Sequence, residues 1–347
     1  MCGIVGAIAE RQVEPILIEG LRRLEYRGYD SAGIALLGDG DGIQRRRTEG
    51  KVQRLADNLE EHPVAGVCGV AHTRWATHGP PSERNAHPHV SGTRVAIVHN
   101  GIIENFEALK AELIERGQEF DSDTDTEIVA HLIREALEDG AEDLFEAVRE
   151  TVERLQGAYA LAVVSPDDPN CVITARAGCP VVLGVGFGEN FVASDVAALL
   201  PVTRRFIFLE EGDLARLTRD GIEIRDREGN LVDRPVKESE LVADAMDRGR
   251  YRHFMQKEIH EQPRAVAETL EDRVGESQVF AQAFGPEAAD IFARTRAVQI
   301  VACGTSYHAG LVAKYFIERL CGLPCMVEIA SEFRYRAPVV PADTLYV

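Results

Sequence analysis

The chain has 347 residues and a formal net charge of −19, a length that allows two domains with separate cores. The acidic charge disfavours nucleic-acid binding, and no apolar run or signal peptide indicates a membrane or secreted protein. The seven scattered cysteines suggest no disulfide framework, which favours a reduced, cytoplasmic protein.

The first 240 residues predict groups of strands separated by helices. We expect strands at 3–9, 32–37, 66–72, 94–99, 158–165, 171–176, 181–186, 191–194, 206–209 and 213–217. Helices are expected at about 14–25, 105–116, 125–138 and 142–155. Because the helices are grouped between sets of strands, the pattern favours an α+β fold of stacked layers.

The second residue is a candidate nucleophile. The chain starts Met1-Cys2-Gly3, and methionine is readily removed before a residue as small as cysteine. Removal leaves a thiol and a free α-amine on Cys2, and an α-amine with a pKa of about 7.7–8.0 can act as a base at neutral pH. N-terminal nucleophile enzymes combine nucleophile and base in this way. The alternative is a small apolar residue that opens a strand.

Acyl transfer from an amide also needs donors that stabilise an oxyanion. The Asn100 side-chain amide and the Gly101 backbone N–H, at the end of a predicted strand, are candidates. The alternative is an ordinary Asn-Gly turn.

A glutamine-like substrate carries an α-carboxylate and an α-ammonium, which call for an arginine and a carboxylate. The candidates are Arg74 and Asp125. Alternatively, Asp125 or Thr124 only caps the helix that follows.

Five histidines lie close together in the sequence, at positions 72, 78, 87, 89 and 99. Their spacing does not place pairs on one helix face, and the Cys321–Cys325 pair lacks a second pair that could complete a zinc site. We therefore expect no metal and no cofactor, and we interpret the histidines as structural residues in polar loops.

The composition changes near residue 240, where charged, helix-prone sequence begins. A strand at 298–302, a helix at 307–320 and a strand at 324–329 then predict a βαβ unit, with a third strand starting at 344. The turn Cys303, Gly304, Thr305 and Ser306 could cradle a phosphate or simply begin a capped helix. Because so few strands cannot bury both faces of a sheet, we interpret the chain as the front part of a longer protein.

Together these segments resemble the glutamine–fructose-6-phosphate aminotransferase (isomerizing) family, also called glucosamine-6-phosphate synthases. The matching stretches, which cover essentially the whole chain, are 2–9, 20–33, 72–79, 85–89, 99–104, 194–195, 200–212, 253–263, 303–307 and 328–336. The resemblance implies an N-terminal-nucleophile αββα sandwich followed by the start of an α/β sugar-isomerase (SIS) domain. The implied domains are a type-2 glutamine amidotransferase (glutaminase) domain at 2–240, a helical lead-in at 241–290 and an incomplete SIS domain at 291–347.

The same resemblance implies a role for each candidate residue. Cys2 would be the nucleophile, Asn100 and Gly101 the oxyanion hole, and Arg74 and Asp125 the groups that hold glutamine. Further implied members of the site are Thr77 and His78 in the glutamine pocket, Trp75 at the ammonia gate, Arg27 and Tyr29 near the lid, and Cys303, Gly304, Thr305 and Ser306 at the sugar phosphate.

The implied reaction makes glucosamine 6-phosphate and L-glutamate from fructose 6-phosphate and L-glutamine, in hexosamine synthesis. A γ-glutamyl thioester would form on Cys2, and ammonia would pass to the sugar site. This chain lacks the family's phosphate loop and second SIS domain, so we expect glutaminase activity alone from it, and a homodimer when the protein has full length. The alternatives are another N-terminal-cysteine amidotransferase (phosphoribosyl, asparagine or glutamate-synthase type), which should lack an SIS domain, and a non-catalytic sugar-phosphate sensor or inert fragment.

Overall fold

The computed structural model describes residues 2–38, 42–75, 79–239, 251–270, 274, 279–284 and 287–347. The chain divides into two compact units, Met1–Arg250 and Tyr251–Val347. The expected domain boundaries at 240 and 290 remain predictions, since residues 240–250 lie outside the described part.

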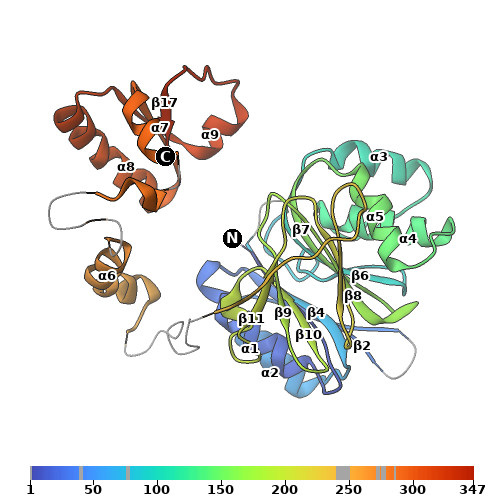
Figure 1. Ribbon diagram of the computed structural model, residues 1–347. Helices are drawn as coiled ribbons and strands as arrows, with labels where there is room; N and C mark the ends of the chain where they lie inside the picture. The colour runs from blue at the N-terminus through green and yellow to red at the C-terminus, as the bar shows by residue number, and fades with distance from the viewer. Residues whose placement is uncertain are drawn as a thin grey trace. The chain divides into compact units, whose positions relative to one another are not determined.

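The first unit is a sandwich of two antiparallel sheets with helices on both outer faces (Figure 1). The larger sheet has the strand order β14-β11-β9-β10-β1-β4-β2-β3, and the smaller sheet has the order β13-β12-β8-β7-β6-β5. Helices α1 and α2 cover the larger sheet, whereas α4 and α5 cover the smaller one, with α3 packed beside α4. This arrangement confirms the predicted αββα architecture.

The strands of the larger sheet are β1 (Gly3–Ile8), β2 (Ser31–Leu37), β3 (Ile43–Glu49), β4 (Cys68–Arg74), β9 (Val182–Val185), β10 (Asn190–Ala193), β11 (Arg205–Phe208) and β14 (Val236–Glu238). Those of the smaller sheet are β5 (His89–Ser91), β6 (Val95–Ile103), β7 (Gly157–Ser165), β8 (Asp168–Ala177), β12 (Leu214–Leu217) and β13 (Ile222–Arg225). The helices are α1 (Glu14–Leu24), α2 (Val52–Glu61), α3 (Phe106–Glu115), α4 (Thr126–Glu138), α5 (Leu144–Arg154) and the short 3₁₀ turns η1 (Glu25–Arg27) and η2 (Val196–Ala198).

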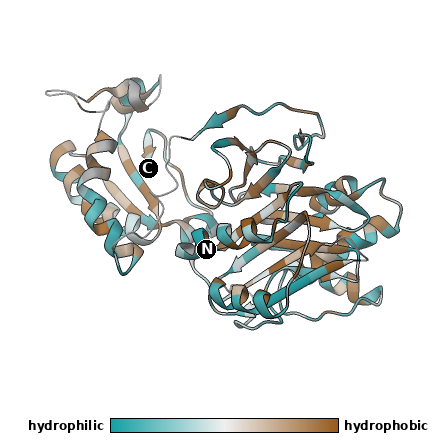
Figure 2. Cartoon of the chain, turned by 90° about the horizontal axis from the view of Figure 1, so that it is seen from below, coloured by the Kyte–Doolittle hydropathy of each residue, from teal (hydrophilic) through white to brown (hydrophobic). Residues whose placement is uncertain are grey.

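Strand β1 shows why the inner strands are so apolar. Its side chains alternate: Val5 and Ala7 pack against the helix layer, whereas Ile4 and Ile8 lie in the core between the two sheets. Because both faces are covered, all six residues of β1 are buried. Figure 2 shows the same pattern, with hydrophobic strands inside and hydrophilic residues on the outer helix faces.

The sequence did not predict β3 and α2. Strand β3 is rich in arginine and forms the edge of the larger sheet, with side chains that are only half-buried, so it lacks the apolar alternation of a typical strand. Helix α2 buries just Val52, Leu55 and Leu59, a narrow stripe in otherwise polar sequence. Both elements therefore carry a weak hydrophobic signal.

Two nearby phenylalanines, Phe187 in the turn between β9 and β10 and Phe191 in β10, provide a paired test of this packing. Phe191 is fully buried in the core beneath α1, whereas Phe187 is fully exposed. We expect Phe191→Ala to lower the free energy of unfolding by about 3–5 kcal/mol, because it leaves a cavity. The control Phe187→Ala should change it by less than about 0.5 kcal/mol. Urea denaturation followed by circular dichroism measures both, and equal effects would contradict the described register.

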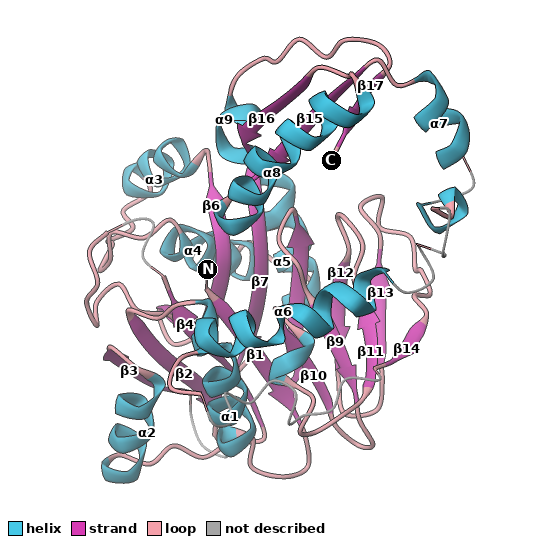
Figure 3. Ribbon diagram, turned by 90° about the vertical axis from the view of Figure 1, so that its left-hand side faces the viewer, coloured by secondary structure: helices cyan, strands magenta, loops and turns pink. Residues whose placement is uncertain are grey.

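The second unit contains the predicted βαβ element. Strands β15 (Ala297–Ala302) and β16 (Cys325–Ile329) are parallel, and they are joined by α8 (Gly304–Phe316) and the π-turn η5 (Ile317–Cys321), as Figure 3 shows. The remaining elements are α6 (Phe254–Leu270), η4 (Ala281–Phe284), α7 (Ala288–Arg294), α9 (Ala330–Tyr335) and β17 (Thr344–Tyr346), which pairs with β15. Among the described residues of the whole chain, no helix is both long and apolar enough to cross a membrane.

Candidate active site

The thiol of Cys2 lies at the edge of the larger sheet where β1 begins and β4 ends. Cys2 directly precedes β1, and the antiparallel register pairs Gly3 with Thr73, which places the end of β4 beside the thiol. The Trp75 N–H donates to Cys2 Sγ at 3.1 Å, and the thiol is 3.5 Å from the Trp75 carbonyl. Burial raises the pKa of the Cys2 thiol, and the Trp75 N–H partly opposes this shift. The thiol therefore needs a base to become a nucleophile near neutral pH.

Asn100 and Gly101 approach the thiol from the other sheet. Both lie inside β6, so the alternative interpretation as an Asn-Gly turn is wrong. The Asn100 Nδ2 donates to the Cys2 carbonyl at 3.3 Å. Gly101 has φ +131°, and an added Cβ would lie 1.9 Å from the Ala158 carbonyl oxygen, so no larger residue fits there.

The two candidate groups for the substrate's charges are buried near the same thiol. Arg74 is 3% exposed, and its guanidinium donates to the Gly79 and Pro80 carbonyls at 3.2 and 3.4 Å. Asp125 makes no cap hydrogen bond with α4, so the capping alternative is wrong for its side chain. Instead its Oδ2 accepts the Ile103 N–H at 2.9 Å.

One pocket joins these residues. Cys2, Arg74, Trp75, Gly101 and Asp125 line it, and the rest of its wall is His87, His99, Thr124 and Thr126. Asn100 reaches this site through its bond to the Cys2 carbonyl. The structure thus brings together a thiol, amide donors, a cation and an anion, while the roles of these residues remain predictions. Thr77 and His78 lie outside the described residues.

The backbone of Gly28, between Arg27 and Tyr29, lies against the Trp75 side chain. Gly28 has φ +117°, and a Cβ there would lie 2.2 Å from the Trp75 ring, so the ring packs directly on this backbone. Trp75 is 53% exposed, and Tyr29 is exposed with Lys51 Nζ 5.5 Å from its ring centre. Arg27, the last residue of η1, directly precedes Gly28 in the sequence. The predicted lid and gate residues are therefore neighbours, while their roles remain predictions.

A cluster of buried histidines lies beside the pocket, and two of them, His87 and His99, line it. His72 and His87 stack with ring centres 4.2 Å apart, and His89 meets His87 edge-on at 4.8 Å. The expectation of histidines in polar loops is wrong for His72 and His99, which lie in β4 and β6, and for His89, which lies in β5. In the described part of the chain, no group of three His, Cys, Asp or Glu side chains is arranged to hold a metal.

Burial keeps these histidines neutral. It lowers the pKa of His72 and of His89 to about 3, and it lowers the pKa of His87 well below its ordinary value. His72 contacts the candidate oxyanion hole, since its Nε2 lies 3.0 Å from Asn100 Oδ1. This contact was not predicted from the sequence. The signal that could have found it is strand alternation, because His72 and Arg74 are two apart on β4 and so share a face.

The buried histidines make stability depend on pH. In the unfolded chain each histidine has a pKa of about 6.5, so below that pH the unfolded state binds protons that the folded state excludes. Stability should therefore fall as pH falls from 6.5 toward 3, by about 1.4 kcal/mol per pH unit for each histidine. Urea unfolding of the first unit should show a loss of about 4 kcal/mol between pH 7.5 and 5.5. His89→Gln should remove about a third of this slope, and a flat profile would contradict buried neutral histidines.

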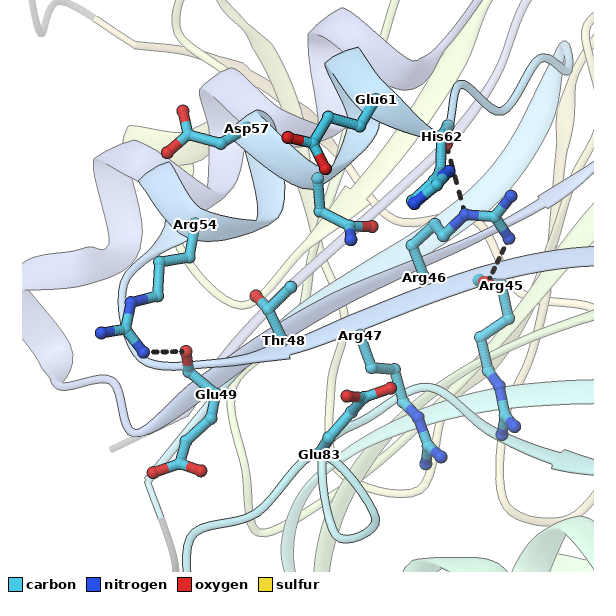
Figure 4. Close-up of a pocket in the computed structure, with 11 residues that line it drawn as sticks. Arg45, Arg46, Arg47, Thr48, Glu49, Arg54, Asp57, Glu61, His62 and Glu83 are labelled. Atoms are coloured by element: carbon cyan, nitrogen blue, oxygen red, sulfur yellow. Dashed lines mark hydrogen bonds between the residues drawn. The ribbon is translucent and has the colours of Figure 1, made fainter.

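A second pocket, along β3 and α2, contains none of the predicted residues (Figure 4). Its arginines are largely occupied by backbone carbonyls: Arg46 donates to His62, and Arg54 donates to Glu49. The acidic side chains that balance them are Glu49, Asp57, Glu61 and Glu83. With mixed charge and no thiol among its described lining residues, this pocket does not repeat the chemistry of the Cys2 pocket.

In the second unit, helix α8 starts at Gly304 and not at 307 as expected, so Gly304, Thr305 and Ser306 form its first turn. Cys303 precedes α8 at the carboxyl end of β15, and Gly304 has φ +58°. Open α/β sheets commonly bind ligands at this edge. The side chains of Cys303, Thr305 and Ser306 are exposed.

Known proteins resemble both units. A glutamine amidotransferase domain family matches residues 72–201, and an SIS domain family matches residues 291–347. The glutamine–fructose-6-phosphate aminotransferases [isomerizing] of Pseudomonas putida and Shewanella oneidensis are 58% and 56% identical over 347 residues. These alignments cover 100% of this chain and 57% of each relative, so the chain spans little more than half their length. A solved glutamine phosphoribosylpyrophosphate amidotransferase from B. subtilis, complexed with ADP and GMP, aligns with 98% of this chain and 69% of its own, at a TM-score of 0.59 and 21% identity, which shows a shared fold.

Proposed function

We infer the function from the premise that the chain belongs, over the part that it spans, to the glutamine–fructose-6-phosphate aminotransferase family. We propose that its first unit hydrolyses L-glutamine to L-glutamate and ammonia. The observation that carries this proposal is the pocket in which Cys2, Arg74, Gly101 and Asp125 meet, with Asn100 bonded to the Cys2 backbone.

The proposed reaction starts when removal of Met1 frees the Cys2 α-amine, which takes the proton from the thiol. The thiolate attacks the side-chain amide carbon of glutamine, and the resulting oxyanion accepts hydrogen bonds from Asn100 Nδ2 and the Gly101 N–H. The protonated amine then donates this proton to the amide nitrogen, the C–N bond breaks so that the nitrogen leaves as ammonia, and a γ-glutamyl thioester remains on Cys2. Water hydrolyses this thioester and restores the thiol.

Arg74 and Asp125 hold the substrate in this proposal. The Arg74 guanidinium pairs with the α-carboxylate and the Asp125 carboxylate with the α-ammonium, which orients the side-chain amide toward the thiol. Thr77 and His78 complete the pocket by the same family resemblance. The buried position of both charged groups strengthens these pairs relative to exposed ones.

For the longer protein, we propose that the ammonia reaches fructose 6-phosphate to give glucosamine 6-phosphate. The turn Cys303, Gly304, Thr305 and Ser306 would begin the sugar-phosphate site, with Trp75 as the ammonia gate and Arg27 and Tyr29 beside the lid. The names of the relatives support this substrate. A cytoplasmic homodimer belongs to the same proposal.

Glutamine turnover by this chain tests the proposal. With glutamine alone, we expect glutamate and ammonia in equal amounts, and adding fructose 6-phosphate should yield no glucosamine 6-phosphate. Enzymatic glutamate detection and mass spectrometry of the sugar measure both products. Binding of fructose 6-phosphate without glutamate release would favour a sensor, and formation of glucosamine 6-phosphate would contradict glutaminase activity alone.

A further inference from the structure

We propose that His72 is a positioning residue for the oxyanion hole: its neutral imidazole donates Nε2–H to Asn100 Oδ1 and thereby turns the Asn100 amide N–H toward the Cys2 side of the pocket. This inference rests on the proposed glutaminase function and adds to it a residue that contacts neither the thiol nor the substrate.

The orientation of the Asn100 amide determines whether its N–H or its oxygen points toward Cys2. Its Nδ2 lies 3.3 Å from the Cys2 carbonyl oxygen, which can only accept a hydrogen bond. The opposite atom, Oδ1, therefore faces His72 Nε2 at 3.0 Å. If the amide were flipped, an oxygen would face the Cys2 carbonyl, and Asn100 would repel a developing oxyanion instead of stabilising it.

The proton on His72 follows from this orientation. An amide oxygen is only an acceptor, so the 3.0 Å contact requires a proton on Nε2. His72 is fully buried, and its pKa is lowered to about 3 by that burial, so the ring is neutral and carries one proton. The competing place for the proton is Nδ1, which lies toward the His99 backbone and makes no hydrogen bond of normal geometry within the described residues. A proton there instead of on Nε2 would leave Nε2 and Asn100 Oδ1 as two acceptors 3.0 Å apart.

The surroundings hold the ring in this position. His72 lies in β4, which pairs with β1 and β2, so its backbone is fixed on both sides. His87 stacks on the ring at an interplanar angle of 19°. His87 is itself fixed, because its Nδ1 accepts the His99 N–H at 3.3 Å, and its Nε2 lies 3.3 Å from Thr126 Oγ1. A rigid donor fixes the direction of the Asn100 amide better than a mobile one.

The first test measures the proton directly. Long-range ¹H–¹⁵N correlation on the histidine-labelled chain reports which ring nitrogen is protonated, with His72→Gln providing the assignment. We expect His72 to carry its proton on Nε2 throughout pH 6–8. A proton on Nδ1 would overturn the proposal, and this readout does not depend on any enzymatic activity. If the chain released no glutamate, the proposed function would fail while this measurement still decided the role of His72.

The second test compares substitutions that differ in where they place a donor. His72→Leu and His72→Asn place no donor at the Nε2 position, so kcat for glutamine hydrolysis should fall about 10²-fold, as for loss of one oxyanion-hole donor. His72→Gln can place an amide N–H there and should recover to within about 10-fold of the wild-type kcat. The KM for glutamine should change less than about 3-fold, because His72 does not contact the substrate.

Two controls separate positioning from packing. Alkylation of Cys2 by iodoacetamide develops no oxyanion, so its rate should stay within about 2-fold in His72→Leu. Thr174→Val removes a buried hydrogen bond to the Leu161 carbonyl elsewhere in the sheets and should lower the Tm without changing kcat. Equal activity of the Leu and Gln variants, or a parallel loss of kcat, glutamine affinity and alkylation, would show that His72 is only a packing residue.

Discussion

Replacing Cys2 by alanine is expected to reduce glutamate release from glutamine by at least about 10³-fold, because Cys2 supplies the only thiol among the described residues that line the pocket. The neighbouring donors would remain, since Asn100 bonds the Cys2 backbone carbonyl and not its side chain. Glutamine should therefore still bind to Cys2→Ala. Glutamate assays give the rate, and isothermal titration calorimetry gives the affinity, which should stay within about 3-fold.

The matched control is Cys321→Ala, which removes an exposed free thiol from the second unit. It should leave glutamate release unchanged and should still lose activity on alkylation. Cys2→Ser should be nearly as inactive as the alanine variant, because a hydroxyl is a much weaker nucleophile than a thiolate. Full activity of Cys2→Ala would exclude the nucleophile assignment, whatever the affinity for glutamine.

The layered fold was predictable because most strands of the first unit have a strong apolar signal. In β1 both faces are buried, so the sequence is continuously hydrophobic, and helices such as α1 show a clear buried face. Strand β3 and helix α2 escaped prediction because an edge strand and a surface helix bury little. Strand β3 pairs with β2, the strand directly before it in the sequence, but its arginine-rich side chains show no apolar alternation that would reveal this pairing.

The candidate site was predictable where chemistry limits the choice of residue. A thiol at the second position, an arginine and an aspartate point to amide substrates with charged ends. The meeting of Cys2 with Asn100 was inferred from function, since 98 residues separate them and the two come from different sheets. The histidine cluster was misjudged because a neutral buried histidine and an exposed loop histidine look alike in sequence.

Replacing Asp125 by asparagine is expected to lower kcat/KM for glutamine by about 10²-fold, mainly through KM, because it removes the buried charge that pairs with the α-ammonium. The substitution keeps the size of the side chain, and an amide oxygen can still accept the Ile103 N–H that Asp125 Oδ2 binds. The fold should therefore persist, and the loss should reflect the missing charge. Initial-rate kinetics with glutamine measure it.

The desamino analogue of glutamine makes this prediction specific. It lacks the α-ammonium, so wild-type protein should hydrolyse it poorly, and Asp125→Asn should lower its kcat/KM by less than about 3-fold. The difference between the two substrates isolates the carboxylate–ammonium pair, as a double-mutant cycle does. Asp123→Asn is the matched control, because Asp123 forms an exposed ion pair with Arg84 at 3.1 Å just before the same helix. Equal losses with both substrates would mean that Asp125 supports the turn before α4 and does not bind the α-ammonium.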